Sequence, residues 1–220
     1  PPPPPPPPFF FQAEDGIRDP LWSRGLEMCI RDSAHPYQKL PVIKKYNNGN
    51  TLENLKWGIV PSWAKKKDFK PLINARLETI DEKVSFKKLI KLQRCVAVAD
   101  GFYEWKRIEK EKKPYYFLRE DKKLIYIAGI FEEDQFCMIT EEASSNVTEI
   151  HHRQPVILNE SDVNKYLNIE ISGSNYLKQS QKSKLSFYEI SKDVNKPTNN
   201  NISLIPVSYT HLTLPTNREV

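Results

Sequence analysis

Seven short runs rich in Val, Ile, Tyr and Phe constrain the fold of this 220-residue chain more than any other feature. Runs of this length and composition, separated by polar or charged turn residues, are typical of β-strands. They occupy residues 40–44, 55–60, 95–99, 101–106, 115–118, 124–131 and 136–140. We therefore expect an α+β domain whose centre is an antiparallel, curved or barrel-like sheet with a few peripheral helices.

Helices are indicated at only two places. In each, a serine that can cap the helix precedes apolar residues at helical spacing. We expect exposed hairpin turns at residues 47–50 and 106–113, and a polar surface stretch at residues 172–184. The first helix has Ser85 as its cap and carries Phe86, Leu89 and Ile90; the second has Ser161 as its cap and carries Val163, Tyr166 and Leu167.

Both ends of the chain are unlike ordinary protein sequence. The first eight residues are all proline, as a run of cytosines would encode, and residues 9–33 and 207–220 resemble translated sequencing adapters. We exclude residues 1–33 and 206–220 from fold reasoning and expect one domain at residues 34–205 that lacks its native beginning. The N-terminal region has no apolar run of the kind found in a secretory signal, so nothing argues for export.

Composition limits the partners and the chemistry. The 33 Lys and Arg against 28 Asp and Glu give a formal net charge of +5, which permits a polyanionic partner without demanding one. The cysteines Cys29, Cys95 and Cys137 show neither a disulfide framework nor metal-ligand spacing, and they suit a reducing cytoplasm. No stretch approaches the 18 apolar residues of a membrane span. We expect no metal, no cofactor and no membrane partner, and a monomer.

Glu104 is the first candidate for catalysis. It lies in the run Asp100-Gly101-Phe102-Tyr103-Glu104-Trp105, where strand alternation places it on the same face as Phe102. Desolvation beside an apolar ring would raise its pKa toward neutrality, as general acid–base catalysis requires. The alternative is a glutamate on a solvated strand face, and the residues alone favour it because Glu is rarely buried.

His151 is the second candidate, and it lies just before the apolar strand expected at residues 155–158. Taken alone, a histidine in such a place is more often a structural hydrogen-bonding residue. Asn74 and Arg76 would face the same way on an extended segment and could jointly bind a polar ligand. Their alternatives are a loop cap and a surface charge.

Trp57 and Trp63 flank Gly58 and Pro61 and are followed by the lysines of residues 65–67. Aromatic rings beside basic residues are typical of a platform on which single-stranded nucleic acid stacks. Core tryptophans beside a solvated lysine run are the alternative. Cys95 and Cys137 lie in apolar runs and are expected to be buried rather than nucleophilic.

Five motifs in order resemble the SOS response-associated peptidase (SRAP) family, whose members process abasic sites in DNA. The motifs are residues 57–64, 73–79, 94–99, 100–105 and 150–158. The resemblance implies proton transfer by Glu104 and His151 and an amine held by Asn74. It also implies that Arg76 contacts DNA near the pocket, and we expect Trp57, Trp63 and Arg153 to hold the strand with it. The family pattern Ile-His-x-Arg-Met-Pro places His151 at the functional position, with Gln154 where methionine is usual.

The resemblance also implies the activity. An N-terminal cysteine forms a thiazolidine crosslink with abasic sites in single-stranded DNA. The protein itself removes the initiator methionine that precedes this cysteine, which is the peptidase activity. The resemblance therefore implies a peptidase with lyase-like, DNA-crosslinking chemistry. An α-amine suits this attack because its pKa lies near 8, far below that of lysine. Cys29 follows Met28, as the family's first cysteine does, but it lies in the adapter-like segment. We expect that Cys29 is not the nucleophile and that the chain as written forms no crosslink.

Two other functions compete with this one. A non-catalytic, single-stranded nucleic-acid-binding β-barrel would equally explain the basic charge and the tryptophans, but it has no use for Asn74, Glu104 and His151. A protease acting on other proteins would need a Ser/His/Asp or Cys/His arrangement, and residues 34–205 do not contain one.

Overall fold

The computed structural model describes residues 34, 36–46, 49–64, 69–109 and 111–195. The expectations for residues 1–33 and 206–220, for Cys29, for the lysines of residues 65–67 and for the last part of the 34–205 domain lie outside these ranges. Within the described ranges, no helix is long and apolar enough to cross a membrane.

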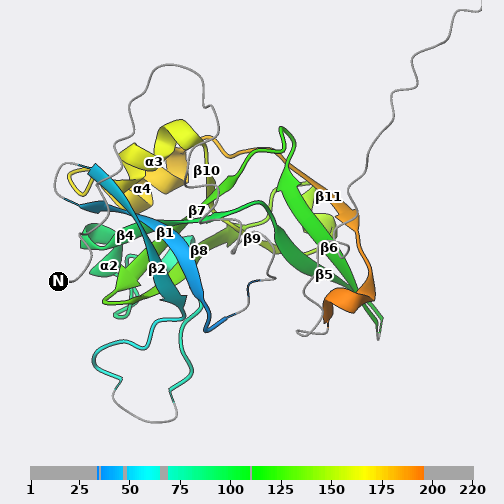
Figure 1. Cartoon of the computed structure of the whole chain (residues 1–220), viewed down its shortest axis with the longest axis horizontal. Coiled ribbons are helices and arrows are strands. Elements are labelled where there is room, and N and C mark those ends of the chain that lie inside the picture. Colours follow the sequence, from blue (N-terminus) through cyan, green and yellow to red (C-terminus); the bar gives the residue numbers. More distant parts are fainter. Residues whose placement is uncertain (1–33, 35, 47–48, 65–68, 110, 196–220) are drawn as a thin grey trace, which may run out of the picture.

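The larger sheet has eight strands, and all seven runs predicted from the sequence form strands in one or the other of the two sheets. Its pairings close the circuit β7–β4–β1–β2–β8–β7, which confirms the barrel-like sheet (Figure 1). Most pairs are antiparallel, but β8 runs parallel to both β2 and β3. The strands are β1 (Lys39–Tyr46), β2 (Gly49–Trp57), β3 (Asn74–Arg76), β4 (Arg94–Ala99), β7 (Ile125–Glu132), β8 (Gln135–Glu142), β9 (Arg153–Pro155) and β10 (Ile157–Leu158).

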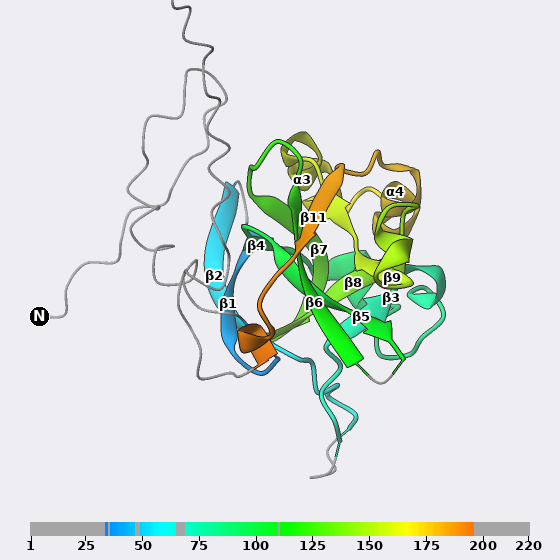
Figure 2. The same cartoon turned by 90° about the vertical axis from the view of Figure 1, so that its right-hand side faces the viewer.

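The smaller sheet is antiparallel and has the order β11–β6–β5. Its strands are β5 (Phe102–Ile108), β6 (Glu111–Arg119) and β11 (Leu185–Glu189). Figure 2 shows this sheet lying in front of the larger one. Phe102, Phe117 and Phe187 lie on one face of it and pack into a core cluster with Ile127 and Phe136 of the larger sheet. This packing sets the position of β5 against β8 and β9.

Three helices cover a second core cluster on the other side of the larger sheet. They are α2 (Leu89–Leu92), α3 (Glu160–Leu167) and α4 (Gly173–Gln179). Short 3-10 turns complete the fold: η1 (Leu77–Thr79), η2 (Val147–Glu149) and η3 (Lys192–Asn195). The buried residues of the cluster include Phe86, Ile90, Val163, Tyr166 and Leu177.

The helix boundaries differ from the sequence expectation. Residues 84–88 form turns, so the first helix begins at Leu89 and Ser85 does not cap it. The second helix begins at Glu160 after Asn159, which places Ser161 inside it. The stretch at residues 172–184 was expected to be polar surface. It contains the α4 helix, in which Gly173, Ser174 and Leu177 are buried. Leu89 and Ile90 lie in the first helix and Val163, Tyr166 and Leu167 in the second, as predicted, but Phe86 lies in the turn before the first helix and both predicted caps were wrong.

Candidate active site

Glu104 faces the larger sheet from the middle of β5, on the same side of the strand as Phe102. Phe102 is paired with Phe117 across the strands, with their rings stacked at 4.9 Å between centroids. The Glu104 side chain is 27% exposed. Burial raises its pKa, and the charge of His151 and a hydrogen bond from the backbone of Trp105 oppose that rise. The structure thus agrees with the desolvated glutamate, not with the solvated alternative.

His151 lies at the end of the loop that joins β8 to β9 and reaches Glu104 from the larger sheet. Its Nδ1 atom is 3.7 Å from Oε1 of Glu104, 3.0 Å from the carbonyl oxygen of Arg153 and 3.3 Å from the amide nitrogen of Arg153. Protonated Nδ1 can donate to the carbonyl or to Glu104, whereas unprotonated Nδ1 accepts from the amide. Nδ1 therefore has a hydrogen-bond partner whether or not it carries a proton.

Asn74 and Arg76 are exposed on one side of β3, while Ala75 between them is buried. This confirms that they face the same way. They are paired with Met138 and Thr140 of β8, and Met138 packs against the core cluster beneath the smaller sheet. Opposed residues of paired strands share a face, so Asn74 and Arg76 lie on the side of the larger sheet toward β5.

The two tryptophans have different environments. The Trp57 indole nitrogen donates to the carbonyl oxygen of Ile73 at 2.8 Å, and its half-buried ring packs against the core. Trp57 therefore supports the chain immediately before Asn74. Trp63 is 59% exposed and meets the edge of Phe69 at 5.7 Å between ring centroids. Of the two rings, Trp63 is the one with a free surface for stacking.

Arg153 lies within a protein network. Its guanidinium binds both carboxylate oxygens of Glu78, at 2.9 and 3.0 Å, and donates to the carbonyl oxygen of Thr140 at 2.8 Å. Burial alone would raise the pKa of Glu78, but the hydrogen bonds and charge of Arg153 hold it below its ordinary value. This pair ties η1 to β8 and β9, so Arg153 has a structural partner in addition to its expected role with DNA.

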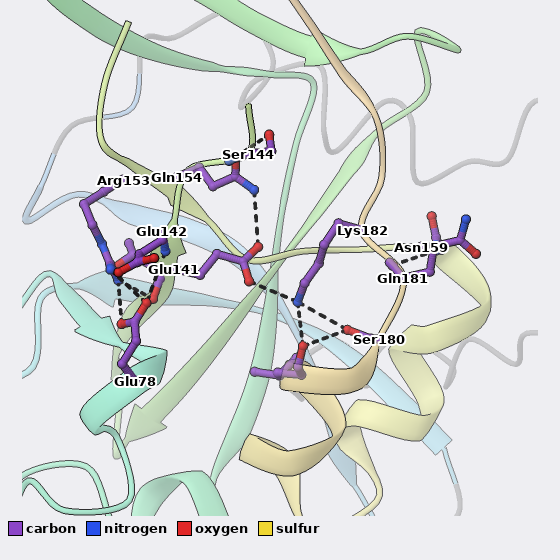
Figure 3. A network of polar contacts seen from close by, with 12 residues as sticks. Glu78, Glu141, Glu142, Ser144, Arg153, Gln154, Asn159, Ser180, Gln181 and Lys182 are labelled. Atoms are coloured by element: carbon purple, nitrogen blue, oxygen red, sulfur yellow. Dashed lines mark hydrogen bonds and ion pairs between the residues drawn. The ribbon is translucent and has the colours of Figure 1, made fainter. Parts of the chain in front are cut away.

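A polar network on the opposite side of β9 was not expected from the sequence (Figure 3). The Gln154 side chain joins Glu141 of β8 to Ser144 in the following loop, and Glu141 forms an ion pair with Lys182 at 3.2 Å. The departure from the family's methionine at Gln154 was the only sequence signal for it.

Asp100 forms a second polar site that sequence reasoning missed. Burial raises its pKa, partly offset by backbone hydrogen bonds and by one from the Tyr116 hydroxyl. Tyr116 lies in a row of rings with Tyr103 and Tyr188 on the side of the smaller sheet that faces away from Glu104. This position makes Asp100 a support for the start of β5.

Among the described residues, neither cysteine is exposed and no metal site is evident. Cys95 and Cys137 are fully buried, as expected, and burial raises the pKa of both thiols. Within the ranges that the structure describes, no group of three His, Cys, Asp or Glu side chains could hold a metal ion. Glu104 and His151 therefore remain the candidates for proton transfer in this part of the chain.

Replacing Glu104 with glutamine is expected to stabilise the folded protein at pH 7. The folded-state pKa of Glu104 is raised, so the folded protein binds more protons than the unfolded chain between the ordinary value and the raised one. The contribution of Glu104 to the free energy of unfolding therefore falls as pH rises through that window. Glutamine does not titrate, so the Glu104→Gln protein should lack this fall. Urea unfolding of both proteins at pH 4 and pH 7 tests this; equal pH dependence in the two would contradict the burial of Glu104.

Comparisons with known proteins identify the family of this chain. The sequence profile of the family "SOS response associated peptidase (SRAP)" matches residues 22–197, which include every residue predicted for the site. Abasic site processing protein YoqW of Bacillus subtilis (strain 168) is 34% identical over 185 residues, covering 77% of this chain and 83% of that protein. Abasic site processing protein YedK of Escherichia coli (strain K12) is 31% identical over 169 residues, covering 73% and 74%.

A solved structure shares the fold. The crystal structure of a protein from Bacteroides thetaiotaomicron superposes with a TM-score of 0.66 at 26% identity, covering 77% of this chain and 81% of that one. The profile matches well over half of the chain, and the ordered motifs around Glu104 and His151 lie within the match. The chain therefore belongs to the SRAP family.

Proposed function

We propose that this protein processes abasic sites in single-stranded DNA by linking itself covalently to them through a thiazolidine. The observation that carries the proposal is the contact at 3.7 Å between Glu104, in the smaller sheet, and His151, in the loop before β9 of the larger sheet. Both are partly buried, and a non-catalytic binding module would gain nothing from a desolvated carboxylate beside a histidine. The names of the bacterial relatives support the coarser part of the proposal, the processing of abasic sites.

The reaction begins with the unprotonated α-amine of an N-terminal cysteine and the aldehyde of the ring-opened abasic sugar. Attack gives a carbinolamine, which loses its hydroxyl as water to leave an imine. Glu104, whose pKa is raised by burial, donates the proton that the leaving hydroxyl needs. His151 can take up the proton that the amine loses.

The ring then closes without an external reagent. The cysteine sulfur adds to the imine carbon, its proton passes to the imine nitrogen, and a five-membered ring holds the sugar. Asn74 would orient the amine from β3. Cys29 cannot take this part while its nitrogen is an amide bonded to Met28, and removal of an initiator methionine from the reacting cysteine would be the accompanying peptidase step.

The direct test incubates the protein, in a form with a free N-terminal cysteine, with single-stranded DNA that carries one abasic site. We expect a species that migrates as protein plus DNA under denaturing conditions and that is absent with intact DNA. If the DNA binds but no covalent species forms, the chain is the non-catalytic binding module instead.

Binding of single-stranded DNA is expected to weaken as salt rises, because cations released from phosphates drive it. Arg76 is exposed beside Asn74, and its replacement by glutamine should reduce the slope of log affinity against log salt by about 0.7, the value for one phosphate contact. Lys87, exposed on the helix side of the larger sheet, is the matched control. An equal loss in Lys87→Gln, or none in Arg76→Gln, would contradict the assigned surface; fluorescence titration measures both.

A further inference from the structure

We propose that Gln154 is a positioning residue that holds His151 opposite Glu104. This inference rests on the proposed function in one respect, because that function is what gives the Glu104–His151 pair a chemical role. Gln154 is 6% exposed and lies three residues after His151, on the opposite side of β9 from Arg153. Figure 3 shows it at the centre of a chain of polar contacts from Lys182 to Ser144.

Both ends of the Gln154 amide are used. Its nitrogen donates to Oε1 of Glu141 at 3.2 Å, and its oxygen accepts from the Ser144 amide at 2.9 Å and from the Ser144 hydroxyl at 3.0 Å. The Glu141 carboxylate can only accept and the Ser144 amide can only donate, so the amide has one satisfactory orientation. A methionine at this position could form neither bond.

At Lys182, the network is anchored outside strands β8 and β9. Lys182 pairs with Oε2 of Glu141 at 3.2 Å and donates to the carbonyl oxygen of Leu177, in α4, at 2.6 Å. Glu141 and Gln154 are also direct partners across β8 and β9. The network therefore fixes β9 to β8 and, through Lys182, to α4.

At Ser144, the network fixes the loop that carries His151. The Ser144 carbonyl oxygen accepts from the Thr148 amide at 2.9 Å, and the Val147 carbonyl oxygen accepts from the His151 amide at 3.0 Å. Gln154 thus holds Ser144 at one end of η2, and η2 holds the backbone of His151 at the other. Glu104 belongs to the other sheet, so its distance from His151 depends on where this loop is held.

Side-chain titration by NMR in the full chain, without DNA, tests the proposal. Burial raises the pKa of Glu104 and the charge of His151 opposes the rise, so displacing His151 should shift the Glu104 midpoint upward. We expect this shift in Gln154→Leu, which loses every bond of the amide, and in Gln154→Glu, which places a carboxylate against Glu141. The Ser144 amide in Gln154→Leu should exchange about five- to tenfold faster.

The double variant Glu141→Gln/Gln154→Glu is the rescue. In it, residue 141 donates to residue 154, residue 154 still accepts from Ser144, and Lys182 keeps an acceptor, so the Glu104 midpoint should return to that of the parent. If Gln154→Leu does not fold, Gln154→Glu against the double variant makes the same comparison.

A matched control separates positioning from loss of stability. Ser174 is another buried polar residue, with its hydroxyl bonded to Asp81 at 2.9 Å, and it lies in α4 away from β9. Ser174→Ala should leave the Glu104 midpoint unchanged. An equal shift in that control, or no shift in the Gln154 variants, would overturn the proposal. The NMR titration uses no DNA, so its result and the result of the crosslinking test do not depend on each other.

Discussion

Alanine at Glu104 or at His151 is expected to slow formation of the DNA adduct by about 10²–10⁴-fold, the usual contribution of a positioned acid or base. Affinity for single-stranded DNA should change little, because neither side chain is proposed to hold the strand. The two losses should not add, since the groups meet at 3.7 Å and act on the same proton transfers. Quenched time courses on denaturing gels, at saturating abasic DNA, give the rates.

Neighbouring residues of the same type provide the controls. His152 is exposed, its ring lies 4.5 Å from that of His151, and it has no proposed role. Glu111 lies on the same hairpin as Glu104 but pairs with Lys192 at the surface. Alanine at either should preserve the rate. Parent-like rates in Glu104→Ala and His151→Ala would show that the proton comes from elsewhere, even if crosslinking itself is observed.

The strands could be predicted from the sequence because their signal is local. Val, Ile and aromatic residues alternate or cluster between turn residues, and this pattern needs no knowledge of what packs against it. The family motifs singled out Glu104 and His151, and the structure places these two side chains 3.7 Å apart; their roles in catalysis stay predictions. Alternation was enough to predict that Asn74 and Arg76 face the same way, although the three-residue strand they form was too short to predict.

The parts that could not be predicted depend on partners far away in sequence. The α4 helix has only Leu177 as a large buried apolar residue, so its segment reads as surface until α2 and η1 are placed against it. Arg153 finds Glu78, which lies 75 residues earlier in the chain. Gln154 likewise needs the end of α4 to be near β8. Such contacts follow from the assembled sheet and not from local pattern.

Gly101→Ala is expected to have the largest effect on stability, about 3 kcal/mol, at the upper end of overpacking costs. A Cβ atom at residue 101 would overlap the carbonyl oxygen of Phe117 and the ring and hydroxyl of Tyr116. Neither can yield easily: Phe117 is fully buried and paired with Phe102, and Tyr116 is held by Asp100. In a domain of this size, the loss corresponds to a fall in Tm of roughly 6–12 °C.

Gly49→Ala is the matched control, because a Cβ there meets nothing within 4 Å. Its Tm should stay close to that of the parent, so a large fall at both positions would point to a general cost of replacing glycine instead of a steric contact at Gly101. The overlap at Gly101 would push β5 away from β6 three residues before Glu104. Gly101→Ala protein that remains folded should therefore also lose adduct formation, because the position of the Glu104 carboxylate, the proposed proton donor, depends on this end of the strand.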